Sequence, residues 1–212
     1  MAGIQDFWQW FVANDRGLVS LAERDWDDML QKIGGSLQAV RPGLWVETRG
    51  KQGLLPVQLI FTADGNAELF PIVMDLLREP PSLSSWRFIA LRPGRGFDFV
   101  LTLGGNRMDP KRLWYKPLFS SQRPEALGLR IGLPRDLSGN KGRVLTAVQL
   151  LLSMGLGEEI AAQEIDHIEV GDLPQQPVLE GFSQITSLAE LLTKRREEKA
   201  RLGYTRGGQG VG

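Results

Sequence analysis

The chain has 212 residues, of which 42% are apolar and 24% charged; these are the proportions of an ordinary folded protein and exclude a mainly disordered one. It contains no cysteine, which excludes disulfides, thiolate metal sites and cysteine nucleophiles and fits a reducing compartment such as the cytoplasm. The net charge is zero, and the longest apolar run, residues 144–156, is shorter than the ~20 residues that cross a bilayer.

The zero net charge is a sum of opposed blocks. Residues 1–86 carry 7 basic and 11 acidic groups, and residues 87–143 carry 12 and 4. Residues 144–192 carry no Lys or Arg and 8 acidic groups, and residues 193–212 carry 6 basic and 2 acidic groups. A strongly acidic stretch thus follows a strongly basic one, which favours either internal neutralisation or a charged contact surface.

The first part of the chain predicts two helices, a hairpin and a third helix. Apolar residues at helical spacing indicate a helix over 4–12, which is expected to break at Asn14-Asp-Arg-Gly17. A capping box at Ser20 and Glu23 then begins a second helix that ends near Arg41. Two apolar segments, 44–48 and 57–61, flank a glycine turn and are expected to pair as a hairpin. A third helix is expected between Asn66 and Pro80.

The middle of the chain alternates apolar and polar residues and is expected to be mostly sheet. Strands are predicted at 86–91, 97–103, 113–119 and 127–133.

The last part of the chain returns to helical periodicity. A buried helix is predicted over 144–156 and a short one over 158–164, followed by a strand at 165–170 and a surface crossing at 173–181. A final helix capped by Ser187 has an apolar face only in its first turns, so its charged part is expected to project from the fold.

These elements predict an α+β fold with a mixed, mainly antiparallel sheet of about five to seven strands packed against helices, and an N-terminal helical pair. We expect a single domain over residues 1–192, followed by a charged helical extension and a glycine-rich tail over residues 193–212.

Three short motifs give the chain a resemblance to a family of bacterial proteins with a domain of unknown function. They are Phe7-Trp8-x-Trp10-Phe11, Ala63-Asp64-Gly65-Asn66 with Leu69-Phe70-Pro71, and Trp86-Arg-Phe-Ile-Ala-Leu-Arg-Pro93. The resemblance spans residues 4 to about 170 and implies a cytoplasmic α+β protein with a regulatory or toxin-neutralising role. It implies no catalytic residues.

A search for catalytic patterns gives little support for an enzyme. His167 is the single histidine, and Asp166 beside it would point to the opposite face of a strand, so a strand-edge histidine is the better interpretation. Asp64, Asn66 and Glu68 are spaced like the start of a calcium loop, but the remaining ligands are missing and helix capping explains them better. We therefore expect no catalytic residue, no metal site and no cofactor.

The favoured interpretation is a protein-binding or regulatory module without catalytic activity, whose partner is a protein. The acidic block 144–192 favours a basic partner. Most of the six tryptophans lie on predicted apolar faces, but Trp10 leaves its apolar stripe and is expected to be partly exposed. The predicted partner-binding residues are Trp10, Glu158, Glu159, Glu164, Asp166, Glu169 and Asp172.

Two other interpretations stay open. One is an enzyme whose site is assembled from carboxylates and arginines distant in sequence. The other is a nucleic-acid-binding protein that uses the basic block 87–143, although the pI of about 6.6 and the neighbouring acidic block argue against a single basic face. No membrane partner is expected.

Overall fold

The computed structural model describes residues 3–103, 106–123, 126–137 and 141–201. Contacts divide the chain into two compact units: unit 1 is Met1–Gly94 with Gly157–Gln163, and unit 2 is Arg95–Leu156 with Glu164–Gly212. The α+β class, the mixed sheets and the N-terminal helical pair are confirmed. The single domain over residues 1–192 stays a prediction.

The helical pair of unit 1 consists of α1 (Ile4–Arg24) and α2 (Trp26–Val40). The expected break at Gly17 is absent, because buried Leu18 and Ala22 continue the apolar face of α1 and outweigh the ~1 kcal/mol that a mid-helix glycine costs. The boundary lies instead at Asp25, whose side chain accepts a hydrogen bond from the backbone N–H of Asp28 at 3.1 Å. The cap at Asp25 therefore replaces the capping box predicted at Ser20.

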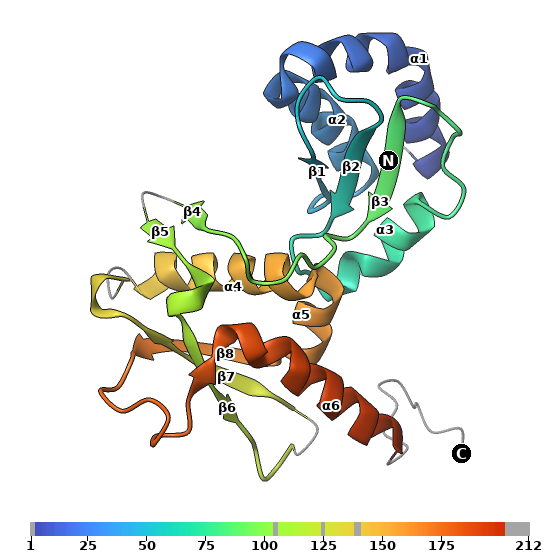
Figure 1. Ribbon diagram of the computed structural model, residues 1–212. Coiled ribbons are helices and arrows are strands. Elements are labelled where there is room, and N and C mark those ends of the chain that lie inside the picture. Colours follow the sequence, from blue (N-terminus) through green and yellow to red (C-terminus); the bar gives the residue numbers. More distant parts are fainter. Residues whose placement is uncertain (1–2, 104–105, 124–125, 138–140, 202–212) are drawn as a thin grey trace, which may run out of the picture. The chain divides into compact units, whose positions relative to one another are not determined.

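The sheet of unit 1 has the order β1-β2-β3 (Figure 1). The predicted hairpin is present, since β1 (Trp45–Arg49) pairs antiparallel with β2 (Val57–Thr62). Strand β3 (Trp86–Ala90) then lies parallel to β2. The crossover between the two parallel strands contains the 3-10 turn η1 (Ala67–Leu69) and α3 (Phe70–Leu76).

An aromatic cluster forms the core between α1 and this sheet. The rings of Phe7 and Phe11 on α1 meet Phe61 of β2 and Phe88 of β3 edge to face, at centroid distances of 6.0 and 5.4 Å. Trp8 lies 4.8 Å from the ring of Phe88. The predicted apolar stripe of the first helix therefore fixes α1 on the sheet.

The second segment of unit 1, Gly157–Gln163, contains most of the short helix α5 (Glu158–Glu164). Ala162 packs against the unit 1 core.

Unit 2 contains a two-stranded and a four-stranded sheet, the latter in the order β8-β7-β6-β9. The strands β7 and β8 are parallel and the other pairs antiparallel. Residues 97–100, predicted to be strand, lie outside the strands. The strands of this unit are β4 (Leu101–Leu103), β5 (Asn106–Met108), β6 (Trp114–Leu118), β7 (Gly128–Leu133), β8 (His167–Asp172) and β9 (Ser183–Gln184).

Two longer helices and three 3-10 turns complete unit 2. Helix α4 (Lys141–Leu156) contacts β8, and its residues Val144, Val148, Leu151 and Leu152 are buried, as their spacing predicts. The 3-10 turns are η2 (Pro110–Arg112), η3 (Arg135–Leu137) and η4 (Ile185–Ser187).

Helix α6 (Leu188–Arg201) buries Leu188 and Leu192 at its start, as expected. Its charged part is held within unit 2, because Arg196 Nε and Lys199 Nζ lie 3.2 and 3.1 Å from the carboxylate of Glu164. The glycine-rich tail from residue 202 onward lies outside the described residues. Among the residues that the structure describes, no helix is both long and apolar enough to span a bilayer.

Candidate functional site

The six acidic residues predicted to bind a partner are divided between the two units. Glu158 and Glu159 belong to unit 1, whereas Glu164, Asp166, Glu169 and Asp172 belong to unit 2. These residues are close together in the sequence, but neither unit contains all six of them.

Glu158 differs most from the expectation, because it is fully buried at 0% exposure. Its carboxylate accepts hydrogen bonds from the backbone N–H groups of Ala63, Gly65 and Arg92 and from the hydroxyl of Thr62. A buried carboxylate with these partners holds the fold together and offers no surface to a partner. The prediction for Glu158 is corrected accordingly.

Three of the unit 2 carboxylates are engaged within their own unit. Asp166 lies 3.1 Å from Arg123 and accepts a hydrogen bond from the backbone N–H of Leu127. Glu164 contacts α6 as described above, and Glu169 lies 3.4 Å from Nε2 of His167. Arg123 comes from the basic block, so this pair is an instance of internal neutralisation.

The other predicted residues lie at the surface. Glu159 and Asp172 are exposed, and Glu159 accepts a hydrogen bond from the Gln163 amide at 3.2 Å. Trp10 is half-buried, as expected, and its ring lies 6.2 Å from Phe7. Trp45, which lies on the edge strand β1, is 55% exposed and so is not one of the tryptophans that pack in the core.

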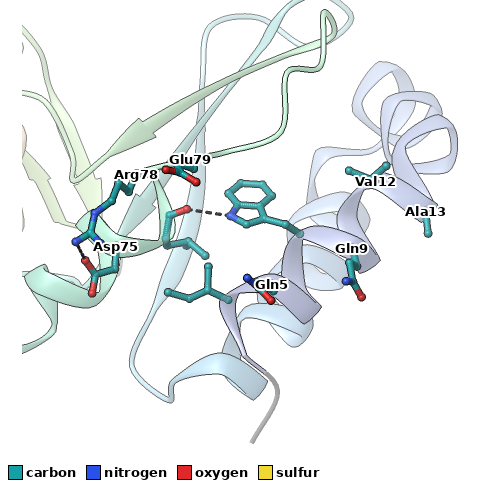
Figure 2. Close-up of a pocket in the computed structure, with 10 residues that line it drawn as sticks. Gln5, Gln9, Val12, Ala13, Asp75, Arg78 and Glu79 are labelled. Atoms are coloured by element: carbon teal, nitrogen blue, oxygen red, sulfur yellow. Dashed lines mark hydrogen bonds and ion pairs between the residues drawn. The ribbon is translucent and has the colours of Figure 1, made fainter.

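A groove in unit 1 runs between α1 and the end of α3, and its volume is about 900 Å³ (Figure 2). Two adjacent rows of α1 side chains form one wall, and the last residues of α3 with the following turn form the other. The lining residues are Ile4, Gln5, Trp8, Gln9, Val12, Ala13, Asp75, Leu76, Arg78 and Glu79.

The base of the groove is apolar and held in a fixed geometry. Ile4, Trp8 and Val12 follow one another at i, i+4 and i+8 on α1 and so form a continuous row. The indole N–H of Trp8 donates to the carbonyl oxygen of Leu76 at 2.9 Å, which ties the two walls together. Trp8 is 8% exposed and Val12 is 48% exposed, so the row emerges from the core toward solvent.

The rim of the groove is polar. Gln5 and Gln9 lie one turn apart on the α1 wall and are exposed (Figure 2). On the opposite wall Asp75 is paired with Arg78, and Glu79 adds a further exposed carboxylate. The charged rim thus carries one net negative charge.

A cluster of charges around the buried side chain of Arg92 lies beside Glu158. The guanidinium of Arg92, 8% exposed, is bound to both carboxylate oxygens of Glu47 and lies 3.6 Å from Asp64. Burial lowers the pKa of Arg92, but the hydrogen bond and charge of Glu47 outweigh it, so that the pKa of Arg92 is raised above its ordinary value. Arg92 is therefore charged at neutral pH.

The groove was missed in the sequence because its walls lie more than sixty residues apart. One signal was present: Val12 continues the row of Ile4 and Trp8 but lies beyond the stripe that faces the core. No group of three or more His, Asp or Glu side chains suited to a metal ion occurs in the described part of the chain.

No family model matches the chain, and no curated protein and no solved structure is significantly similar to it. The resemblance to a bacterial family therefore stays a prediction.

Proposed function

We propose that this chain is a cytoplasmic protein-binding module, and that the groove between α1 and the end of α3 receives an amphipathic helix of its partner. The observation that carries the proposal is the apolar row Ile4, Trp8 and Val12, which leads from the core to an exposed rim. Apolar grooves with a polar rim are a common way in which proteins bind amphipathic helices.

The fixed geometry of the groove supports this use. The side chain of Trp8 is held by its hydrogen bond to the backbone carbonyl of Leu76, and both residues are buried. Binding of a partner therefore does not need to order them. An apolar side chain of the partner would cover Val12 and the exposed edge of Trp8 and remove that surface from water. The amides of Gln5 and Gln9 would then face the polar side of the bound helix.

Charge complementarity specifies the partner further. Unit 1 contains 13 acidic and 9 basic residues, a net charge of −4, and one of these acidic residues, Glu79, lies at the rim of the groove. A helix that carries Lys or Arg next to its apolar side chains would be attracted to such a surface. The acidic block at residues 158–172 contributes less than predicted, because most of its carboxylates are engaged internally.

The proposal is tested by binding-partner capture with two matched variants. Val12→Asp places a charge in the groove, whereas Leu54→Asp places the same charge on another exposed apolar residue of unit 1, 62% exposed in the loop between β1 and β2. We expect the purified partner to bind Leu54→Asp like the parent protein and to bind Val12→Asp at least about tenfold more weakly, a loss of about 1.4 kcal/mol.

Thermal unfolding of both variants serves as the control for folding, since both substituted positions are exposed. Equal affinity of the two variants for the partner would place the contact surface outside the groove.

A further inference from the structure

The carboxyl ends of β2 and β3 meet at a cradle of hydrogen-bond donors that surrounds Glu158. Ala63 N and Gly65 N lie 3.0 and 2.9 Å from Oε1 of Glu158, and Arg92 N lies 2.9 Å from Oε2. The hydroxyl of Thr62 donates to the same Oε2 at 2.6 Å. Four donors from two strand ends thus converge on one carboxylate.

We infer that this cradle is a carboxylate-binding site of unit 1 which the chain fills with its own Glu158, and which accepts a free carboxylate once that side chain is removed. The inference does not depend on the groove or on its partner.

The position of the cradle is that of a ligand site. Strands β2 and β3 are parallel neighbours, and in parallel sheets ligands bind in the crevice beyond the carboxyl ends of the strands. Here the backbone beyond both strands is turned so that its N–H groups point to one place, and Glu158 supplies the acceptor from a segment 66 to 96 residues further along the chain.

The backbone conformation is specialised at both strand ends. Asp64 and Leu91 have φ values of +50° and +56°, a conformation that is uncommon for residues other than glycine and a genuine outlier for leucine. Each lies next to a donor of the cradle: Asp64 between Ala63 and Gly65, and Leu91 before Arg92. Strained backbone of this kind is concentrated at ligand clamps.

The positive charge beside the cradle is shared by Glu158 with the carboxylates of Glu47 and Asp64. The guanidinium of Arg92 places a positive charge close to the carboxylate. Burial has the largest effect on the pKa of Arg92 and lowers it, Glu47 raises it, and the charge of Glu158 raises it further by a smaller amount. Without an anion the hydroxyl of Thr62 and the backbone N–H of Ala63, both buried, would lose this acceptor, which is costly. A planar carboxylate with two oxygens matches the two-by-two arrangement of donors.

Glu158→Ala tests the inference, because the atoms that it removes beyond Cβ correspond to one acetate ion. The full chain of Glu158→Ala is melted at increasing sodium acetate, with sodium chloride added to keep the ionic strength constant. The matched control is Glu159→Ala, which removes the same side chain from the exposed neighbouring position. We expect Glu158→Ala to melt at lower temperature than the control, and acetate to raise its midpoint saturably by at least about 3 °C.

Acetate should leave the midpoints of the parent protein and of Glu159→Ala unchanged, because their cradle is occupied. It should also leave Glu158→Gln unchanged, because the amide side chain still fills the space. An equal acetate effect on Glu158→Ala and Glu159→Ala would overturn the inference.

If Glu158→Ala does not fold well enough to be melted, a refolding assay tests the inference instead. The variant is diluted from denaturant with and without acetate at constant ionic strength, and the yield of soluble protein is measured. A higher yield with acetate than with chloride supports the carboxylate site, and an equal yield overturns it.

Discussion

Two hydrogen bonds join the guanidinium of Arg112 to the carboxylate of Asp136 in unit 2, at 2.9 and 2.6 Å. The hydrogen bond from Arg112 is the main reason why the pKa of Asp136 is lowered from its ordinary value. The two groups are at the surface, so the effect on total stability is small and is screened by salt.

We expect the carboxyl group of Asp136 to titrate below the ordinary range for aspartate, as measured by NMR. Because the folded-state pKa is the lower one, the stabilising effect of the pair is present above the unfolded-state pKa and is lost as pH falls through the folded-state pKa. Arg112→Gln should return the titration of Asp136 toward the ordinary range. An unchanged midpoint in that variant would show that the ion pair does not form in solution.

Neighbouring residues of one type can have opposite roles, as Glu158 and Glu159 show. Both were predicted to face a partner, yet one is buried in the cradle and the other is exposed. The sequence could not separate them, because the partners of Glu158 are mostly backbone N–H groups whose positions depend on the folded strand ends. The sequence showed only that the surrounding block, residues 144–192, contains no Lys or Arg.

At the scale of elements, sequence periodicity predicted most of the fold. The alternating run at 127–133 and the apolar helix at 144–156 both appear within a few residues of their predicted ends, because each buries a continuous face. The boundary between α1 and α2 was misplaced, since a tolerated mid-helix Gly17 was interpreted as a break and the cap at Asp25 was overlooked. The short strands β5 and β9 have too few residues to show a period.

Glycines at two helical positions predict opposite effects of the same substitution. A Cβ added at Gly155 in α4 would overlap the ring of Phe97, which is itself buried, whereas a Cβ at Gly35 in α2 would meet nothing within 4 Å. We expect Gly155→Ala to destabilise the protein by about 1–3 kcal/mol through overpacking. Gly35→Ala should stabilise it by about 0.5–1 kcal/mol, because alanine favours helix.

Urea denaturation of the two variants checks this pair of predictions. A neutral or stabilising Gly155→Ala would mean that Phe97 does not pack against α4 as described.

At the scale of the whole molecule, the zero net charge conceals two units of opposite sign. Unit 1 has a net charge of −4, and unit 2, with 16 basic and 12 acidic residues, has +4. The acidic and basic blocks of the sequence do not coincide with the units, because α5 carries two acidic residues into unit 1. Charge along the sequence is therefore a poor guide to charge on either unit.

The charge of unit 1 leads to a prediction about association kinetics. We expect binding of a basic partner to slow as salt rises, because exposed charges are screened over about 8–10 Å at physiological ionic strength. Glu79→Lys, at the rim of the groove, should slow association more than Glu68→Lys, which reverses an exposed charge elsewhere in unit 1. Surface plasmon resonance at two salt concentrations measures both rates, and equal slowing by the two variants would remove Glu79 from the contact.

Photo-crosslinking from position 12 tests the central claim most directly. The photo-reactive amino acid p-benzoylphenylalanine replaces Val12 in the groove or, in the control, Leu54 in the loop between β1 and β2, both of which are exposed. Illumination with the purified partner is followed by mass spectrometry of the linked peptides. We expect links from position 12 to an apolar side chain within a helix that also carries Lys or Arg, and few links from position 54. Links from position 54 alone, or equally from both positions, would contradict a partner-binding groove between α1 and α3.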